Sequence, residues 1–228
     1  RRAAMHRLGR CLVDGSRAVR AVASTRAKAS VSGRIRGTDA PVIVATKQLI
    51  AEAGGSDAVL SLAQGVVHWD PPREAVDEAM RCLNSGDGAV HQYGPCEGLP
   101  PLREKLREKL REENGLDGVD VMVTSGANQA FVNVILSVAD SSDRVVLFLP
   151  YYFNHLMALQ MTEGGPSVCF GPSDPNTYLP DLKWLSEVMA PSSTCKPPKA
   201  VVIVTPNNPT GAIVSPEMLE QIRGMCGK

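Results

Sequence analysis

The chain has 228 residues, enough for one sizeable core or two modest domains. Hydrophobic residues make up 43% and charged residues 21%, ordinary globular proportions that argue against wholesale disorder. The longest apolar run, residues 145–153, is far shorter than the roughly 20 residues that cross a bilayer as a helix, so no transmembrane helix is expected.

The net charge of zero hides two oppositely charged parts. Residues 1–39 carry ten Lys and Arg against two Asp, whereas residues 40–228 carry fourteen against twenty-two acids. A basic, Ala- and Ser-rich, acid-poor leader predicts a transit peptide to a chloroplast or mitochondrion; without one, the protein is expected in the cytoplasm. Alternatives are a translated upstream region, with Met5 as start, or a basic nucleic-acid arm. The acidic body disfavours nucleic-acid binding by the folded part.

The cysteines and histidines are scattered. No Cys-x-x-Cys pair and no cysteine close to a histidine is present among the six cysteines, at positions 11, 82, 96, 169, 195 and 226. A disulfide framework or a zinc site would need tighter clustering. Reduced, mostly structural thiols in an intracellular compartment are therefore predicted, with no metal site.

The first part of the body is predicted to be helical. An apolar pattern indicates a helix over residues 41–54. A second helix is expected after Asp70, its N-cap, with Pro71 at the first helical position and an end near residue 83. Residues 102–113 form a charged helix with a narrow apolar stripe, which is interpreted as a solvated surface helix.

From about residue 120 the pattern alternates between strand and helix. Apolar strands are predicted at residues 121–124, 144–149, 168–170 and 199–205. Helices are predicted at residues 128–139, 152–162, 181–190 and 216–226, the last capped by Ser215. Such alternation predicts a parallel sheet with crossover helices, and ligands of these sheets bind at the carboxyl ends of the strands.

Two of these strand ends carry segments suited to a cofactor. Strand 121–124 leads into Ser125-Gly126-Ala127-Asn128 and a helix, whose free N–H groups and dipole would suit a phosphate. The alternative is a glycine that only makes a tight turn. Neither common nucleotide motif is present. Strand 144–149 is followed by Pro-Tyr-Tyr-Phe (residues 150–153), where an aromatic ring could stack on a flat cofactor or simply pack in the core or a lid.

Strand 199–205 is followed by the most specific segment of the chain. Residues 206–211 read Pro-Asn-Asn-Pro-Thr-Gly, so prolines on both sides hold an Asn pair in a rigid turn at the end of the strand. A plain turn does not need this ordered string. A functional role is therefore favoured here.

Together, the three strand ends resemble those of class I aminotransferases of the type I pyridoxal phosphate fold. The resemblance continues upstream in S-L-A-Q-G (61–65), W-D-P-P (69–72), Q-Y-G-P (92–95), and G-L-P with L-R (98–103). It covers about residues 40–228. The strings S-L-A-Q-G-V-V-x-W-x-P-P, G-A-N-Q-A-F and P-Y-Y-F-N are most similar to plant and algal aminotransferases for aromatic amino acids and methionine.

The resemblance implies an α/β fold: a mostly parallel sheet with helices on both faces, here truncated. It divides the chain into the leader (1–39), an N-terminal arm with the start of a small domain (40–88), and the N-terminal part of a large cofactor-binding domain (89–228).

It also implies a set of site residues for pyridoxal 5'-phosphate. Gly126, Ala127 and Asn128 would bind its phosphate, Tyr152 would stack on its ring, and Asn208 would bind its phenolic oxygen and help hold the substrate carboxylate.

Further roles are implied for the amino acid and 2-oxo acid substrates and for a homodimer. Gly65 would offer backbone to the carboxylate, and Trp69 is either a wall of the substrate pocket or a packed anchor. Tyr93 would reach the partner subunit's phosphate. No nucleic-acid or membrane partner is expected.

In this family the lysine that holds the cofactor, an acid for its ring nitrogen and an arginine for the substrate all follow the Asn motif. We therefore expect the lysine beyond Lys228, no catalytic residue in this chain, and a chain that is the N-terminal half of an enzyme and inactive alone. The Ser-x-x-Lys spacing at residues 193–196 is no substitute, because it lies in a Pro-rich loop and precedes the Asn motif.

Two alternatives stay open. The chain could be a non-catalytic product that binds phosphate compounds or pairs with a full-length subunit. The enzyme could also be a lyase, or resemble aminocyclopropane-carboxylate synthases of the same fold, because the residues present do not separate these reactions.

Overall fold

The computed structural model describes residues 30–65, 67–162, 167–192 and 195–227. Most of the predicted leader, residues 1–29, lies outside the described residues, as do Ser193 and Lys228. The chain divides into one compact unit up to Arg36 and a second from Gly37 onward. Helix α2 (Gly33–Arg36) is the described helix of the first unit. In the second unit, Asp39 is tied to the body: its backbone N–H donates to Gln160 Oε1 at 3.0 Å, and Gln160 Nε2 donates to Asp39 Oδ2 at 2.9 Å.

The first helices of the second unit contain no buried residue. All three predicted helices of this region are present, but two begin elsewhere than expected. The second starts after Pro72, whose side chain makes no capping bond, so Asp70 is not its N-cap as predicted. The third starts at Pro100 instead of residue 102, because proline suits the first turn of a helix. These elements are α3 (Val42–Glu52), α4 (Arg73–Asn84), the short 3₁₀ helix η1 (Gly88–His91) and α5 (Pro100–Asn114).

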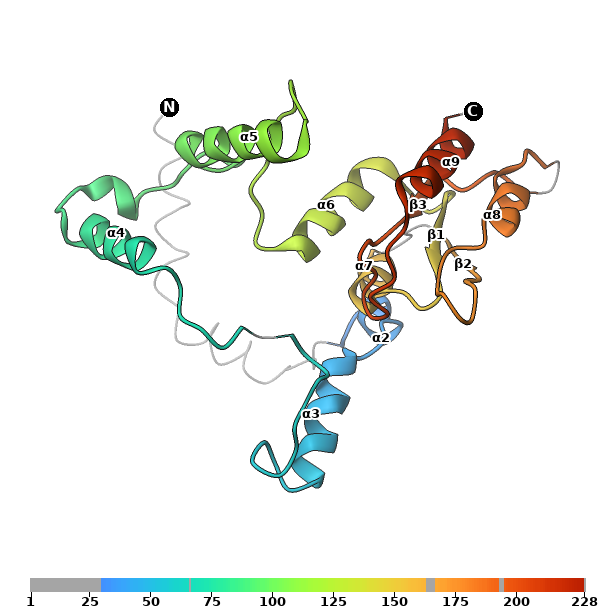
Figure 1. Ribbon diagram of the computed structural model, residues 1–228, viewed down its shortest axis with the longest axis horizontal. Helices are drawn as coiled ribbons and strands as arrows, with labels where there is room; N and C mark the ends of the chain where they lie inside the picture. Colours follow the sequence, from blue (N-terminus) through green and yellow to red (C-terminus); the bar gives the residue numbers. More distant parts are fainter. Residues whose placement is uncertain (1–29, 66, 163–166, 193–194, 228) are drawn as a thin grey trace, which may run out of the picture. The chain divides into compact units, whose positions relative to one another are not determined.

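A three-stranded parallel sheet organises the rest of the chain. Its strands are β1 (Arg144–Phe148), β2 (Ser167–Gly171) and β3 (Ala200–Val202), in the order β2-β1-β3. Figure 1 shows β1 between its two neighbours. Val146 lies opposite Cys169 on one side and Val201 on the other. The central strand is buried without alternation, as its sequence predicts.

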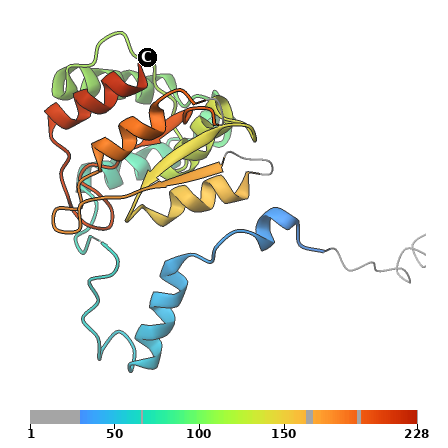
Figure 2. The ribbon, with the colours of Figure 1, turned by 90° about the vertical axis from the view of Figure 1, so that its right-hand side faces the viewer.

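Helices cover both faces of this sheet. On one face, Val145 and Leu147 of β1 pack with Ile135 of α6 (Ala127–Val138) and with Leu156 and Leu159 of α7 (Phe153–Met161). On the other face, Val146 and Phe148 of β1 pack with Leu185 of α8 (Leu182–Met189) and Ile222 of α9 (Pro216–Cys226). Figure 2 shows α7 on one side of the strands and α8 and α9 on the other. The predicted fold class is confirmed.

Two details of the strands differ from the sequence prediction. Residues 121–124 do not form a strand; the Val123 N–H donates to the carbonyl of Glu97, and no strand of the described residues pairs with this segment. An apolar run becomes a strand only where a second strand completes its hydrogen bonds. The strand predicted at 199–205 ends already at Val202.

The predicted cap of the last helix is confirmed, because Ser215 accepts from the N–H of Met218 at the start of α9. Asp181, predicted as the first residue of its helix, is instead the N-cap of α8 and accepts from the N–H of Trp184. No helix in the described part of the chain is long and apolar enough to cross a membrane.

Candidate functional site

Tyr152 lies in the short connection between β1 and α7. It is the N-cap residue of that helix and is half-buried. Its hydroxyl accepts a hydrogen bond from Asn154 Nδ2 at 2.6 Å. The Tyr152 ring is therefore fixed at the carboxyl end of the central strand, the edge of a parallel sheet where ligands bind.

His155 packs against the Tyr152 ring, a role that the sequence analysis missed. Its ring stacks on Phe131 of α6, with centroids 4.2 Å apart, and meets the Tyr152 ring edge-on at 5.3 Å. Burial lowers the pKa of His155 below its usual 6.5, so the ring is neutral at pH 7. The stack joins the start of α6 to Tyr152. The three-residue spacing of Tyr152 and His155 could have indicated their contact, whereas nothing local in the sequence indicates the stack of His155 on Phe131.

The N-terminus of α6 is an open backbone cradle. Gly126, the N-cap, has φ +84°, a conformation that favours glycine, and no side chain caps the helix. A Cβ at Gly126 would meet no atom within 4 Å, and Ala127 and Asn128 are exposed. The preceding turn is held by Gln129, whose side chain accepts from the Ser125 N–H. An anion could therefore approach the first-turn amides directly.

The Asn pair forms a tight turn in which the two residues differ. Asn207 Oδ1 accepts from the backbone N–H and the hydroxyl of Thr210, at 3.2 and 3.0 Å. Its own backbone bonds to Ala212 and Gly211 close the loop. Asn208 is exposed on this turn. Asn207 therefore fixes the turn that presents Asn208, a positioning role that the sequence analysis did not assign.

A cleft opens at these strand ends. Asp174 organises one wall, because its carboxylate accepts from the N–H groups of Asn176 and Thr177; these bonds lower its pKa. This loop carries Tyr178 at φ +58°, an unusual conformation for a tyrosine. Polar and aromatic side chains lining the cleft are Phe148, Tyr151, Tyr152, His155, Ser173, Tyr178 and Asn207.

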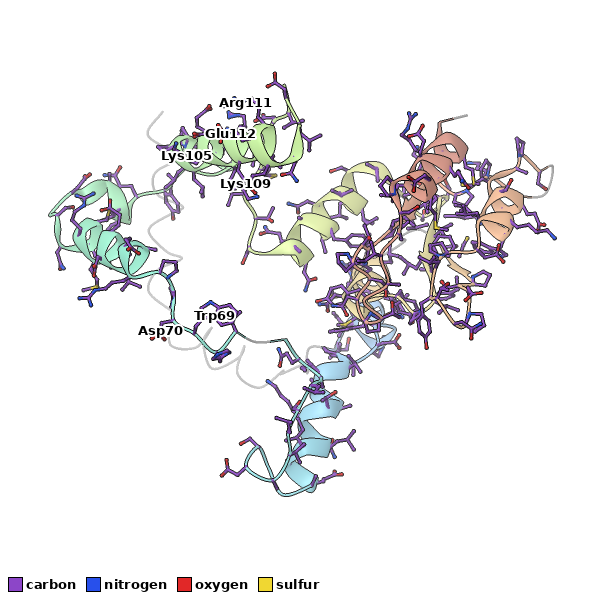
Figure 3. All side chains as sticks on the ribbon, in the orientation of Figure 1. Trp69, Asp70, Lys105, Lys109, Arg111 and Glu112 are labelled. Atoms are coloured by element: carbon purple, nitrogen blue, oxygen red, sulfur yellow. The ribbon has the colours of Figure 1, made fainter. Side chains whose placement is uncertain are left out.

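Of the predicted site residues, Tyr152 alone lines the cleft. The other seven are exposed and lie outside its lining: Gly126, Ala127, Asn128, Asn208, Gly65, Trp69 and Tyr93. The Trp69 ring makes an edge contact with His68 at 5.2 Å. Figure 3 labels Trp69 on the extended segment before α4. The structure thus brings Tyr152 and the Asn turn to one edge of the sheet, but Gly65, Trp69 and Tyr93 do not belong to that edge.

A family assignment follows from comparison with known proteins. Residues 57–228 match the family described as aminotransferase class I and II. The chain belongs to this family. Its members depend on pyridoxal phosphate.

Individual relatives support the assignment. An aromatic aminotransferase, ISS1, of Arabidopsis thaliana is 46% identical over 196 residues, which are 86% of this chain and 48% of that protein. An aspartate/prephenate aminotransferase of Thermus thermophilus is 33% identical, over 80% of this chain and 46% of that one. The structure of the T. thermophilus aspartate aminotransferase with maleate has a TM-score of 0.72 at 29% identity, covering 87% and 50%. The chain spans about half the length of the relatives it matches.

The described residues fit the family's cofactor. Its phosphate needs an anion site, and α6 offers an uncapped N-terminus with open space beside Gly126. Its flat ring needs an aromatic surface and a polar edge, which Tyr152 and Asn208 could provide.

Proposed function

We propose that this chain supplies cofactor-binding and substrate-binding parts of a pyridoxal phosphate-dependent aminotransferase, which moves an amino group from an amino acid to a 2-oxo acid. The observation that carries the proposal is the common location of Tyr152 and the Asn turn at the carboxyl edge of the sheet, with the start of α6 joined to Tyr152 through the stack of Phe131 and His155. Because the chain belongs to the class I and II aminotransferases, we assign pyridoxal phosphate chemistry to this arrangement.

In this proposal each part of the site does one task. The first-turn amides after Gly126, at Ala127 and Asn128, bind the phosphate. Tyr152 supports one face of the ring, and Asn208 donates to its phenolic oxygen and contacts the substrate carboxylate. When bound, pyridoxal phosphate supplies the electron sink for bond breaking at the substrate's α-carbon. The lysine that moves the proton remains predicted beyond Lys228.

We propose aromatic amino acids or methionine as amino donors. The 46% identity to a protein named as an aromatic aminotransferase supports this choice over aspartate, the donor named for several relatives of lower identity. Gly65 is proposed to bind the substrate carboxylate through its backbone, and Trp69 to form part of the pocket wall.

We also propose a homodimer in which Tyr93 reaches the phosphate bound by the partner. Its side chain is fully exposed and so is free to make such a contact.

The chain is proposed to have three parts. They are an organellar leader (residues 1–39), the arm and start of the small domain (residues 40–88), and part of the large domain (residues 89–228). A fluorescent fusion of residues 1–39 that stays in the cytosol would contradict the leader proposal.

The phosphate site can be tested with one matched pair of variants. Ala127→Asp places a carboxylate at the first position of α6, where the helix dipole tolerates it but an anionic ligand is repelled. Ala127→Asn has nearly the same shape without the charge. Titration of the 228-residue chain with pyridoxal phosphate, followed by its absorbance, should show weaker binding for the Asp variant only. Equal binding by both variants would place the phosphate elsewhere.

The reaction is tested with the protein expressed from its own gene. Amino transfer from phenylalanine, tyrosine, methionine and aspartate is measured with a panel of 2-oxo acids. Preferential use of the first three donors supports the proposal. Aspartate as the preferred donor would overturn the substrate class while leaving the aminotransferase proposal intact, and loss of amino acid without transfer would indicate a lyase.

A further inference from the structure

Two cysteine thiols accept hydrogen bonds from one arginine at the end of the sheet opposite the cleft. Arg144, the first residue of β1, donates from Nε to Cys169 Sγ at 3.0 Å and from a terminal nitrogen to Cys195 Sγ at 2.8 Å. The same terminal nitrogen donates to the carbonyl of Lys196 at 3.0 Å. Of the five described cysteines, these two are the ones that a single side chain holds together.

The two thiols come from segments far apart in the sequence. Cys169 lies on β2, directly opposite Val146 of β1, and is half-buried on the face that α8 and α9 cover. Cys195 lies in the loop between α8 and β3 and is exposed. The Arg144 side chain therefore links a strand to a loop, with one accessible thiol and one sheltered thiol as its partners.

We propose that Cys169 and Cys195 form an oxidation site that closes into a disulfide. Both sulfurs lie within hydrogen-bond distance of one guanidinium, so the disulfide requires the Cys195 sulfur to leave Arg144 and meet the Cys169 sulfur. The site is separate from the proposed cofactor site, because Arg144 begins the strand whose opposite end leads to Tyr152.

The chemistry balances with hydrogen peroxide as oxidant. The sulfur of the accessible Cys195 attacks one peroxide oxygen: an S–O bond forms, the O–O bond breaks, and the departing hydroxide leaves as water with the thiol proton. The sulfur of Cys169 then attacks the oxidised sulfur of Cys195. The S–S bond forms, the S–O bond breaks, and a second water leaves with the Cys169 proton. Two thiols lose two electrons, and one peroxide becomes two waters.

Trypsin places the two cysteines on separate peptides, because cleavage after Arg144, Lys183 and Lys199 leaves each with one cysteine. The 228-residue chain is treated with hydrogen peroxide at low protein concentration, alkylated, digested without reduction and analysed by mass spectrometry. We expect peptides 145–183 and 184–199 joined by a disulfide, with reversal by dithiothreitol. The exposed Cys96 and Cys226 serve as internal controls and should remain in unlinked peptides.

Variants separate a specific site from general thiol oxidation. Cys169→Ser should abolish the linked peptide and leave an oxidised Cys195 that dimedone traps, whereas Cys226→Ser should change nothing. Arg144→Lys keeps the positive charge but cannot hold both sulfurs through two separate nitrogens, so the yield of the linked peptide should fall. Disulfides that join Cys195 mainly to Cys96, to Cys226 or to a second chain would overturn the proposal, as would an unoxidised Cys195.

Discussion

Residues 40–126 and residues 127–227 contain comparable helices but differ in what those helices bury. The first segment has α3, α4 and α5 and no buried residue among those described. The second holds all eleven buried hydrophobic residues of the described chain, most of them on β1 and the helices packed against it. The two segments therefore differ in how far packing stabilises their helices, since most helical stability in proteins comes from packing an apolar face.

Helix α5 shows how the first segment forms without a core. Its surface carries ion pairs one turn apart, Lys105 with Glu108 and Lys109 with Glu113. Figure 3 labels the two lysines along α5. Each such pair is worth only about 0.2–0.5 kcal/mol. The Arg103 guanidinium bonds to the carboxylate of Asp120 and so ties the helix to the segment that follows it. These contacts specify the helix but stabilise it little.

The largest predicted difference between the two segments concerns one leucine from each. Leu185 of α8 is fully buried against Val146 and Phe148, whereas Leu102 of α5 is 46% exposed. Leu185→Ala should lower the free energy of unfolding by about 2–5 kcal/mol, because it leaves a cavity in the core. Leu102→Ala should change it by less than about 0.5 kcal/mol. Urea unfolding followed by circular dichroism measures both, and equal losses would mean that the first segment contributes a core of its own.

A smaller effect is expected from adding one methyl group beside the sheet. A Cβ at Gly171 would lie 2.6 Å from the Phe148 ring and 2.7 Å from the Trp184 ring. Gly171→Ala should therefore cost about 1–3 kcal/mol through overpacking. Gly88→Ala, in η1, meets no atom within 4 Å and serves as the control in the same unfolding assay. An unchanged Gly171 variant would show that the two rings can move apart freely.

A third pair of variants compares a helix cap in each segment, where loss of a cap lowers the free energy of unfolding by about 1 kcal/mol. Ser215 caps α9 through the N–H of Met218, so Ser215→Ala should lose roughly that amount. Asp70 was predicted to be an N-cap but makes no capping bond to α4. Asp70→Ala should therefore leave the unfolding midpoint unchanged. A loss at Asp70 equal to that at Ser215 would restore the sequence-based assignment.

These cases show which features the sequence could predict. The β1 run and the turn of residues 206–211 are specified locally, by apolar β-branched residues and by prolines and glycine, and both were predicted. Residues 121–124 have the same apolar character as β1 but lack a neighbouring strand among the described residues, and nothing within four residues reveals that. The stack of His155 on Phe131 likewise joins two helices that are separated by β1, so only the fold brings the rings together.

The smallest predicted effect is a pH dependence of the free energy of unfolding, which arises from His155 in residues 127–227. Burial lowers the pKa of His155 in the folded state below the value of about 6.5 that it has when unfolded. Between these two pKa values the unfolded chain binds the extra proton, so the stabilisation present above pH 6.5 is lost as the pH falls toward the folded-state pKa.

The free energy of unfolding should therefore decrease as the pH falls below about 6.5, before carboxylates such as Asp174 titrate at lower pH. His155→Phe keeps an aromatic ring against Phe131 but cannot take up a proton, so it should flatten this part of the profile. His91→Gln, at an exposed histidine in the first segment, should leave the profile as it is. If His155→Phe retains the full slope, the proton that destabilises the fold binds elsewhere, and the difference in burial between the two segments does not govern how the protein responds to mild acid.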